Sequence, residues 1–361
     1  MTEPRKTPLY DLHVEMGGKM VDFAGWMMPV NYGDGVAAEH KQCREKAALF
    51  DVSHMGQVSL HGENIAQKLE TLCPSSFTTL PAGKARYTFF TNPEGGIMDD
   101  LIVSAAEDHF FLVVNASMRQ QDVAHLRSLE LEVREIDRSL IAIQGPSAEA
   151  VVAAHAPMVT SLKFMETASF ELMGHKCRIS RLGYTGEDGF EISLPNAQAI
   201  EITRAFLAHP ELAPAGLGAR DSLRLEAGLC LYGNDIDNST SPVEANLTWA
   251  MQKKRREQGG FPGAGRILRE LANGPGRRLV GIKPEGRAPA RRGVEVADKA
   301  GNIIGSITSG GFGPSFEGPV SMGYVTTECA APGTGVNLLI RGKNHPATII
   351  KLPFVAQNYK R

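Results

Sequence analysis

The sequence predicts an α+β protein in which a mixed body, residues 1–277, precedes a β-rich C-terminal domain, residues 278–361. Two observations predict this class. Runs with helical and with strand periodicity alternate through the body. After the glycine-rich segment 258–265, the chain consists of short apolar runs separated by Gly, Pro and Asn turns, a pattern typical of a small antiparallel β-barrel.

In the body, helices are expected where apolar residues recur every three to four positions, and Asn64 is a candidate N-cap for one of them. The expected helices cover residues 37–49, 64–72, 117–128, 147–154 and 196–207. Strands are expected where short apolar runs lie between turn residues. They cover residues 86–91, 97–104, 110–115, 140–143, 177–181 and 190–194.

A hairpin turn is expected at residues 92–96, which read Asn-Pro-Glu-Gly-Gly, because glycine adopts a positive φ at little steric cost. In the C-terminal domain the expected strands cover residues 279–282, 303–307, 320–325, 336–340 and 347–352. Their even spacing is the reason for predicting a barrel.

Composition excludes several classes of protein. The 38 Lys and Arg residues against 40 Asp and Glu residues give a net charge of −2, which argues against a general nucleic-acid binder. No apolar run approaches the roughly 20 residues of a membrane-spanning helix. The five cysteines are scattered and form no C-x-x-C pair, so neither a disulfide framework nor a cysteine zinc site is expected. A metal-free protein in a reducing compartment, the cytoplasm, is the simplest interpretation.

Common catalytic and nucleotide-binding motifs are missing from the sequence. It has no P-loop, no G-x-G-x-x-G after a strand, no G-x-S-x-G and no H-E-x-x-H. The 38 glycines are therefore interpreted mainly as turn residues.

The segment 97–103 carries the most informative carboxylate. On a strand, Asp99 shares a face with Ile97 and Leu101, so an acid lies on an apolar stripe, where its burial is costly unless it is paired. One interpretation is a turn aspartate that binds nearby backbone N–H groups, and the other is a functional carboxylate in a buried pocket. Asp100 lies on the opposite face and is the weaker candidate.

Three further features carry charge. Strand alternation directs Glu191 away from the core residues around it, toward solvent or a cavity, with solvent favoured. Segment 218–228 contains Arg220 and Arg224, for which a structural role and an anionic ligand are equal alternatives. The basic run 253–256 is interpreted as a solvated face, with attraction of an acidic partner as the alternative.

Taken together, several long segments give the sequence a family resemblance. They read Thr-Pro-Leu-Tyr-Asp at 7–11, Met-Val-Asp-Phe-Ala-Gly-Trp-Met-Met-Pro at 20–29, Phe-Asp-Val-Ser-His-Met at 50–55, Gly-Gly-Ile-Met-Asp-Asp-Leu at 95–101, Gln-Gly-Pro at 144–146, Gly-Tyr-Thr-Gly-Glu at 183–187, Gly-Ala-Arg-Asp-Ser-Leu-Arg-Leu-Glu-Ala-Gly at 218–228, Gly-Gly-Phe-Pro-Gly at 259–263 and Thr-Ser-Gly at 308–310. The chain resembles the aminomethyltransferase (T-protein) family of the glycine cleavage system from about Thr7 to Tyr359.

The resemblance implies a three-lobed, cloverleaf fold around a central tetrahydrofolate site. The body would form two interleaved lobes, the strand-rich one spanning about 50–140, and the C-terminal barrel would be the third. The implied reaction releases ammonia from an aminomethyl group on the dihydrolipoyl arm of H-protein and transfers the methylene to tetrahydrofolate, giving 5,10-methylenetetrahydrofolate. Tetrahydrofolate would be the co-substrate and lipoylated H-protein the protein partner, with no metal, nucleic acid or membrane involved.

Carried over residue by residue, the resemblance places the catalytic aspartate at Asp99, where it would activate the folate nitrogen and stabilise the cation formed as ammonia leaves. The implied folate contacts are Met55, Asn115, Tyr184, Glu191, Arg220, Trp249, Arg291 and Tyr359. A carboxylate such as Glu191 suits the donor edge of a pterin, so the resemblance favours a cavity over solvent for this residue.

Related proteins of this fold define the alternatives. A folate-dependent demethylase of a small sulfonium compound is one, and dependence on H-protein distinguishes it from the aminomethyltransferase. A folate-binding iron–sulfur assembly protein is another, but segment 228–233, Gly-Leu-Cys-Leu-Tyr-Gly, lacks its Lys-Gly-Cys-Tyr-type motif. Sarcosine and dimethylglycine dehydrogenases add a flavin domain, for which this chain has neither the fingerprint nor the length.

Overall fold

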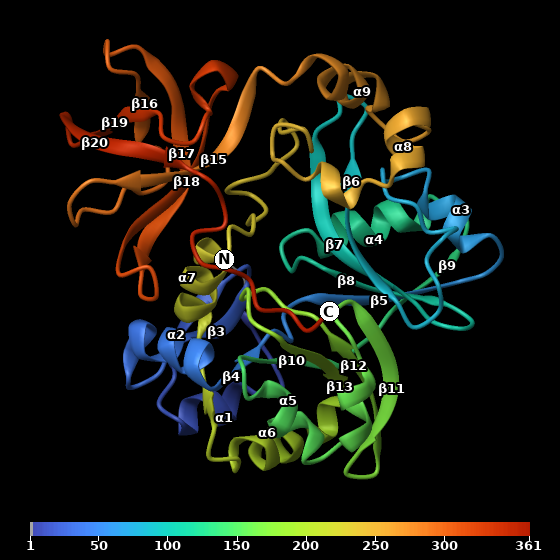
Figure 1. Ribbon diagram of the computed structural model, residues 1–361. Coiled ribbons are helices and arrows are strands. Elements are labelled where there is room, and N and C mark those ends of the chain that lie inside the picture. The colour runs from blue at the N-terminus through green and yellow to red at the C-terminus, as the bar shows by residue number, and fades with distance from the viewer. Residues whose placement is uncertain (1–2) are drawn as a thin grey trace.

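The computed structural model describes residues 3–361 and divides them among three lobes (Figure 1). Two lobes are each built on an open sheet, and the third is a closed barrel of antiparallel strands at the C-terminal end of the chain. The predicted α+β class with a C-terminal antiparallel barrel is confirmed.

The first lobe is built on a six-stranded sheet. Helices cover one face of this sheet, and Phe190, Ile192 and Leu194 enter the core beneath them, as strand alternation predicted. The strands in spatial order are β11 (Glu166–Leu172), β12 (His175–Arg181), β13 (Gly189–Leu194), β10 (Ser139–Gln144), β4 (Ala47–Asp51) and β14 (Leu212–Pro214). The covering helices are α1 (Tyr10–Glu15), α5 (Ala148–Ala153) and α6 (Ala199–Leu207).

The second lobe is built on a five-stranded antiparallel sheet. The strands in spatial order are β6 (Ala85–Thr91), β7 (Ile97–Ala105), β8 (Phe110–Val114), β5 (Gly56–His61) and β9 (Glu132–Glu135). Helices α3 (Ile65–Leu69) and α4 (Arg119–Arg127) pack on the face that carries Leu101 and Val103. Helices α8 (Lys253–Gln258) and α9 (Ala264–Asn273) belong to the same lobe (Figure 1).

The faces of the two sheets that point away from these helices meet in the middle of the molecule. Phe111 and Val113 of β8 share one apolar cluster with Leu140 and Ala142 of β10. Helix α7 (Leu217–Glu226) contributes to the same cluster and also contacts the barrel, and α2 (Gly35–Glu45) packs beside it. The centre of the molecule is therefore bounded by both sheets and by α7.

The barrel closes through six strands around its own apolar core. In order around the barrel these are β15 (Arg277–Pro284), β18 (Gly318–Thr326), β17 (Ile303–Gly313), β16 (Glu295–Ala297), β19 (Gly335–Ile340) and β20 (Lys343–Ile350). The chain then leaves the barrel and runs back across the first lobe (Figure 1). No helix in residues 3–361 combines the length and the apolar character needed to cross a membrane.

The structure corrects one predicted helix and adds strands that the sequence analysis missed. The helix expected over 37–49 ends at Glu45, and residues 47–51 form β4, because they are fully buried between β10 and β14 as sheet partners. The N-terminal sheet of β1 (Arg5–Lys6), β3 (Trp26–Asn31) and β2 (Lys19–Phe23) lacked apolar alternation and was not expected. Strands β5, β9, β11, β14 and β16 were also missed.

Candidate functional site

A narrow cavity lies between the two sheets. From the second lobe it is lined by Ile102 of β7 and Phe111 of β8, and from the first lobe by Ser180 of β12 and by Glu191 and Ser193 of β13. Glu191 thus faces a cavity and not the solvent that strand alternation favoured. Both faces of the first sheet are covered, one by helices and the other by the second lobe, so alternation alone does not identify the solvent side.

Glu191 lines this cavity, and Arg220 lies close enough for its positive charge to act on Glu191, but the two side chains form no ion pair. The Glu191 side chain is 9% exposed and receives no hydrogen bond from residues 3–361. Burial raises the pKa of Glu191, and the positive charge of Arg220 opposes that rise. The guanidinium of Arg220 lies over the Tyr184 ring, 4.9 Å from its centroid, and its buried Nη1 has no hydrogen-bond partner. Unsatisfied buried charges of this kind point to a polar ligand.

Asp100 of β7 lies on the face of the second sheet that looks toward this centre. Its partners across the sheet place Tyr87, Phe89 and Ile102 on the same face. The Tyr87 hydroxyl donates to Oδ2 of Asp100 over 3.0 Å, and Nδ2 of Asn115 donates to Oδ1 over 2.9 Å. Burial raises the pKa of Asp100 to about 7. A carboxyl with this pKa can both hold and release a proton near neutral pH.

Asp99 occupies a different environment. As strand alternation predicted, its side chain points to the opposite face from Asp100, and it is completely inaccessible to solvent. That face is the one covered by α3 and α4, so Asp99 faces Asp122 of α4. Of the eight expected folate contacts, only Asn115 forms a hydrogen bond with Asp99 in the described chain. The geometry therefore favours Asp100 over Asp99 for contact with a ligand at the centre.

The remaining expected contacts are more dispersed. Met55 packs at the edge of the cluster that joins the two sheets. Trp249 is 65% exposed and stacks on Tyr87. Arg291 is exposed on the barrel, where its Nη1 donates to the carbonyl of Gly310 over 3.2 Å. Tyr359 stacks on Phe164 with ring centroids 4.1 Å apart.

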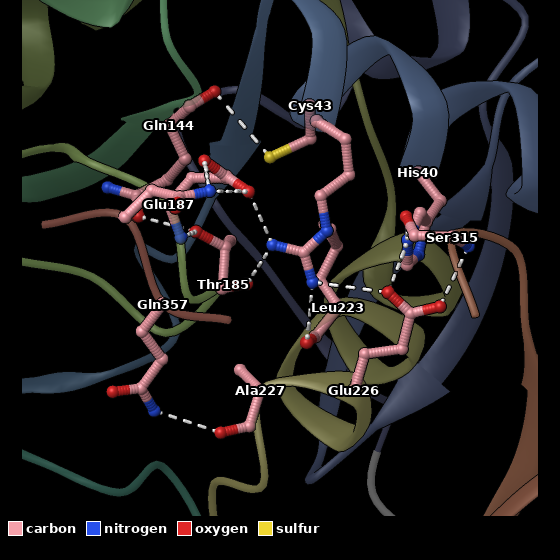
Figure 2. Close-up of polar contacts among 12 residues, drawn as sticks. His40, Cys43, Gln144, Thr185, Glu187, Leu223, Glu226, Ala227, Ser315 and Gln357 are labelled. Carbon is pink, nitrogen blue, oxygen red and sulfur yellow. Dashed lines mark hydrogen bonds and ion pairs between the residues drawn. The ribbon is translucent and has the colours of Figure 1, made fainter. Parts of the chain in front are cut away.

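The loop that carries Tyr184 is held by a buried cluster around Arg44 of α2. Nη1 of Arg44 donates to the carbonyl of Thr185 over 2.9 Å and to Glu187 over 2.8 Å. Nη2 donates to Glu226 of α7 over 3.3 Å. Figure 2 shows Glu187 and Glu226 entering this cluster from opposite sides.

The cluster continues from Glu226 into the barrel. His40 shares a 3.0 Å hydrogen bond with Oε2 of Glu226, whose Oε1 accepts the backbone N–H groups of Ser315 and Phe316 (Figure 2). One side chain thereby ties α2, α7 and a barrel loop together. Because α7 also carries Arg220, the cluster fixes the position of that residue.

Sequence reasoning did not single out Tyr87 or Arg44. The sequence did hold a signal for Tyr87, namely the hairpin turn expected at residues 92–96. With the observed register, that hairpin places Tyr87 on the same face of the sheet as Asp100. No pattern pointed to Arg44, because its partners are separated from it by more than 140 residues.

Two family models match the chain. Residues 9–255 match the model described as the GCVT N-terminal domain, and residues 277–356 match the glycine cleavage T-protein C-terminal barrel domain. The chain belongs to the glycine cleavage T-protein family.

Relatives of this family match along most of their length. An "aminomethyltransferase, mitochondrial" of Dictyostelium discoideum is 44% identical, with 99% of this chain and 94% of the relative covered. A protein of the same name from Pisum sativum is also 44% identical, with 99% and 91% covered. A crystal structure of the glycine cleavage system aminomethyltransferase T from Bartonella henselae is 44% identical, with a TM-score of 0.93 and 99% of both chains covered.

Proposed function

We propose that this protein is the tetrahydrofolate-dependent aminomethyltransferase of a glycine cleavage system. It releases ammonia from the aminomethyl-dihydrolipoyl group of H-protein and transfers the methylene to tetrahydrofolate, yielding 5,10-methylenetetrahydrofolate. Family membership supports the reaction class. The observation that carries the assignment of the site is the unpaired charge of Glu191, which lines the cavity between the sheets, and of the neighbouring Arg220.

Glu191 and Arg220 have the chemistry to orient a pterin. The Glu191 carboxylate can accept two hydrogen bonds from the amino-pyrimidinone edge, whose donors match its two oxygens. The free Nη1 of Arg220 can donate to a carbonyl or carboxylate oxygen of the same ligand. Tyr184, under the guanidinium of Arg220, offers a flat ring beside the bound rings. Met55, Asn115, Trp249, Arg291 and Tyr359 stay predicted folate contacts.

In this proposal Asp100 takes the catalytic role that the sequence analysis gave to Asp99. Its carboxylate faces the centre, is fixed by donors from Tyr87 and Asn115, and has a pKa of about 7. A negative charge there stabilises the cation that forms on carbon as ammonia leaves, and it can accept the proton released when the second folate nitrogen closes the ring. Asp99 is separated from such a ligand by its own strand.

Lipoylated H-protein is the proposed protein partner, and it distinguishes this function from a sulfonium demethylase. That the protein works without a bound metal stays a prediction from the sequence. A reducing compartment is proposed because all five cysteines are free thiols. A location in the cytoplasm also stays a prediction. The names of two relatives contain the word mitochondrial and lend it no support.

The test is methylenetetrahydrofolate formation from tetrahydrofolate and aminomethyl-loaded H-protein, with Asp100→Asn measured beside the wild type. The expected result is activity in the wild type and a loss of about 100-fold or more in the variant, with tetrahydrofolate binding retained. Wild-type protein that binds tetrahydrofolate but does not use H-protein would overturn the proposed reaction. Full activity in Asp100→Asn would overturn only the assigned residue.

A further inference from the structure

Two carboxyl groups lie buried behind the sheet strand that carries Asp100. Asp99 of β7 and Asp122 of α4 both have no solvent exposure. Neither oxygen of Asp122 receives a hydrogen bond from any N–H or hydroxyl group in residues 3–361, and the group that faces them is the carboxyl of Asp99. Two ionised carboxylates in contact, without solvent and without a cation, would be prohibitively costly.

The pair is therefore expected to hold one proton between its two carboxyl groups. The proton belongs on Asp99, because Asp122 lies in the first turn of α4, where the positive end of the helix dipole favours a negative charge. In that state the Asp99 carboxyl donates to Asp122, and the burial of both groups together with the charge of Asp122 raises the pKa of Asp99. The only negative charge of the pair then lies on Asp122.

Asn115 connects this pair to Asp100. Its Nδ2 donates to Oδ1 of Asp99 and to Oδ1 of Asp100, each over 2.9 Å, and its backbone N–H reaches Oδ2 of Asp99 over 3.3 Å. The two hydrogens of this amide nitrogen are shared among the two carboxyl groups and the carbonyl of Asp100, 3.1 Å away. Asp99 thus anchors the group that orients Asp100.

We propose that Asp99 and Asp122 form a positioning pair that shares one proton, anchors Asn115 and keeps the buried negative charge on Asp122, away from the reactive carboxylate of Asp100. The proposal rests on the proposed function in giving Asp100 the reactive role. The other titratable groups around the pair are His125, one turn further along α4, and Tyr232, whose pKa is raised by burial and by the charges of Asp99, Asp237, Asp122 and Asp100.

A matched pair of variants separates this role from plain structural support. In Asp99→Asn the introduced amide donates to Asp122 and still accepts from Asn115, so the charge stays on Asp122. In Asp122→Asn the introduced amide donates to Asp99, so the charge moves to Asp99, beside Asp100. Both variants keep the size of the side chain and the net charge of the pair. They differ in where the charge lies.

The primary measurement is the titration midpoint of Asp100, followed by carboxyl-carbon NMR of the full-length protein without substrate. Asp99→Asn should leave it near the wild-type value, and Asp122→Asn should raise it by about one pH unit, because a like charge moves closer. The doubly substituted protein, which has no charge in the pair, should titrate below the wild type. The acidic limb of the kcat profile should move in the same directions.

A second readout tests the anchoring of Asn115. Asp99→Ala removes the acceptor for Asn115 and should lower kcat about tenfold or more with little change in KM for H-protein, whereas Asp99→Asn should restore kcat to within about threefold of the wild type. Thermal unfolding verifies that each variant is folded.

Equal midpoints for Asp100 in Asp99→Asn and Asp122→Asn would overturn the proposal. So would a loss in Asp99→Asn as large as that in Asp100→Asn, because Asp99 would then be the reacting group. The NMR titration needs no substrate, so it tests the pair even if wild-type protein forms no methylenetetrahydrofolate, a result that would count against the proposed function alone.

Discussion

Trp249 lies nearly parallel to Tyr87, with ring centroids 5.3 Å apart and an angle of 20° between the planes. The indole is 65% exposed, whereas the Tyr87 hydroxyl donates to Asp100. A continuous aromatic stack therefore leads from the protein surface to the carboxyl at the centre. Large exposed aromatic side chains are costly to leave uncovered, so this position favours contact with a flat ligand.

Replacement of Trp249 by alanine should weaken folate binding more than it slows the reaction. Offset-stacked rings contribute roughly 0.5–1.5 kcal/mol beyond their buried area, so KM for tetrahydrofolate should rise about three- to tenfold. Because Tyr87 and Asp100 stay in place, kcat should fall less than KM rises. Steady-state kinetics at varied tetrahydrofolate measures both constants. Met158→Ala is the control, an equally exposed apolar residue on the first lobe, and it should change neither.

Glu191→Gln should lower tetrahydrofolate affinity by about tenfold or more and yet leave the protein as stable or more stable. The folded-state pKa of Glu191 is raised by burial, so its ionised form costs stability once the pH exceeds the unfolded-state value. The gain in the variant should thus be absent near pH 4 and grow as the pH rises. Thermal unfolding at about pH 5 and about pH 8, together with calorimetric titration, checks both effects.

Glu187→Gln is the matched control for Glu191. Glu187 is also buried, but it accepts hydrogen bonds from Arg44 and from Asn358. Loss of that charge should destabilise the protein by about 1–3 kcal/mol at neutral pH. If both variants lost similar stability, Glu191 would have a structural role and the ligand assignment would fail.

Arg44→Ala should be one of the most destabilising single changes in the chain. It leaves the carboxylates of Glu187 and Glu226 buried without their shared cation, which costs about 3–5 kcal/mol. The loop that carries Tyr184 would lose its attachment as well, so tetrahydrofolate affinity should fall in the folded fraction. Denaturant unfolding measures the first effect. Arg44→Lys keeps the charge but not the branched geometry of the guanidinium. Its unfolding free energy should lie between those of the wild type and Arg44→Ala.

The basic run 253–256 divides into one structural residue and three exposed ones. Arg255 is 9% exposed, lies over the Phe261 ring and donates to the carbonyls of Cys73 and Gly260, each over 3.2 Å. Lys253, Lys254 and Arg256 are exposed on α8. The interpretation of the whole run as a solvated face is therefore wrong for Arg255.

Charge reversal of Lys253, Lys254 and Arg256 to Glu should raise KM for H-protein several-fold, and more strongly at low salt, if the run attracts an acidic partner. The free energy of unfolding should stay within about 0.5 kcal/mol of the wild type. Arg255→Ala should show the opposite pattern, with lower stability and little salt dependence. An unchanged KM in the triple variant would leave these three residues as ordinary surface.

The sequence predicted most elements of the body and barrel because the apolar residues of these elements recur at the regular spacing of helices and strands. The hairpin at 92–96 formed as expected, and Gly96 is required there because a Cβ would collide with the carbonyl of Asn238. Segment 47–49 was misassigned because a strand buried on both faces has no alternation to distinguish it from a buried helix.

The site was harder to predict than the fold. Alternation correctly placed Asp99 and Asp100 on opposite faces of β7, but it could not show which face looks toward the centre of the molecule. Both sides of β7 are covered, one by helices and one by the other lobe, and the side covered by the other lobe faces the cavity that contains Glu191. Whether a given face of β7 is covered by helices or by the other lobe is set by tertiary packing between residues far apart in the sequence.

The segment after the barrel has a consequence for the order in which the protein matures. Backbone N–H groups of Phe354 and Val355 bind the carbonyl of Glu226, and that of Asn358 binds the carbonyl of Gly186 in the loop of Tyr184. On the ribosome, the two sheets can assemble while this segment is still untranslated. The ligand loop gains its last restraints only after residues 354–358 emerge, so a stalled nascent chain would carry folded lobes but an unfinished site.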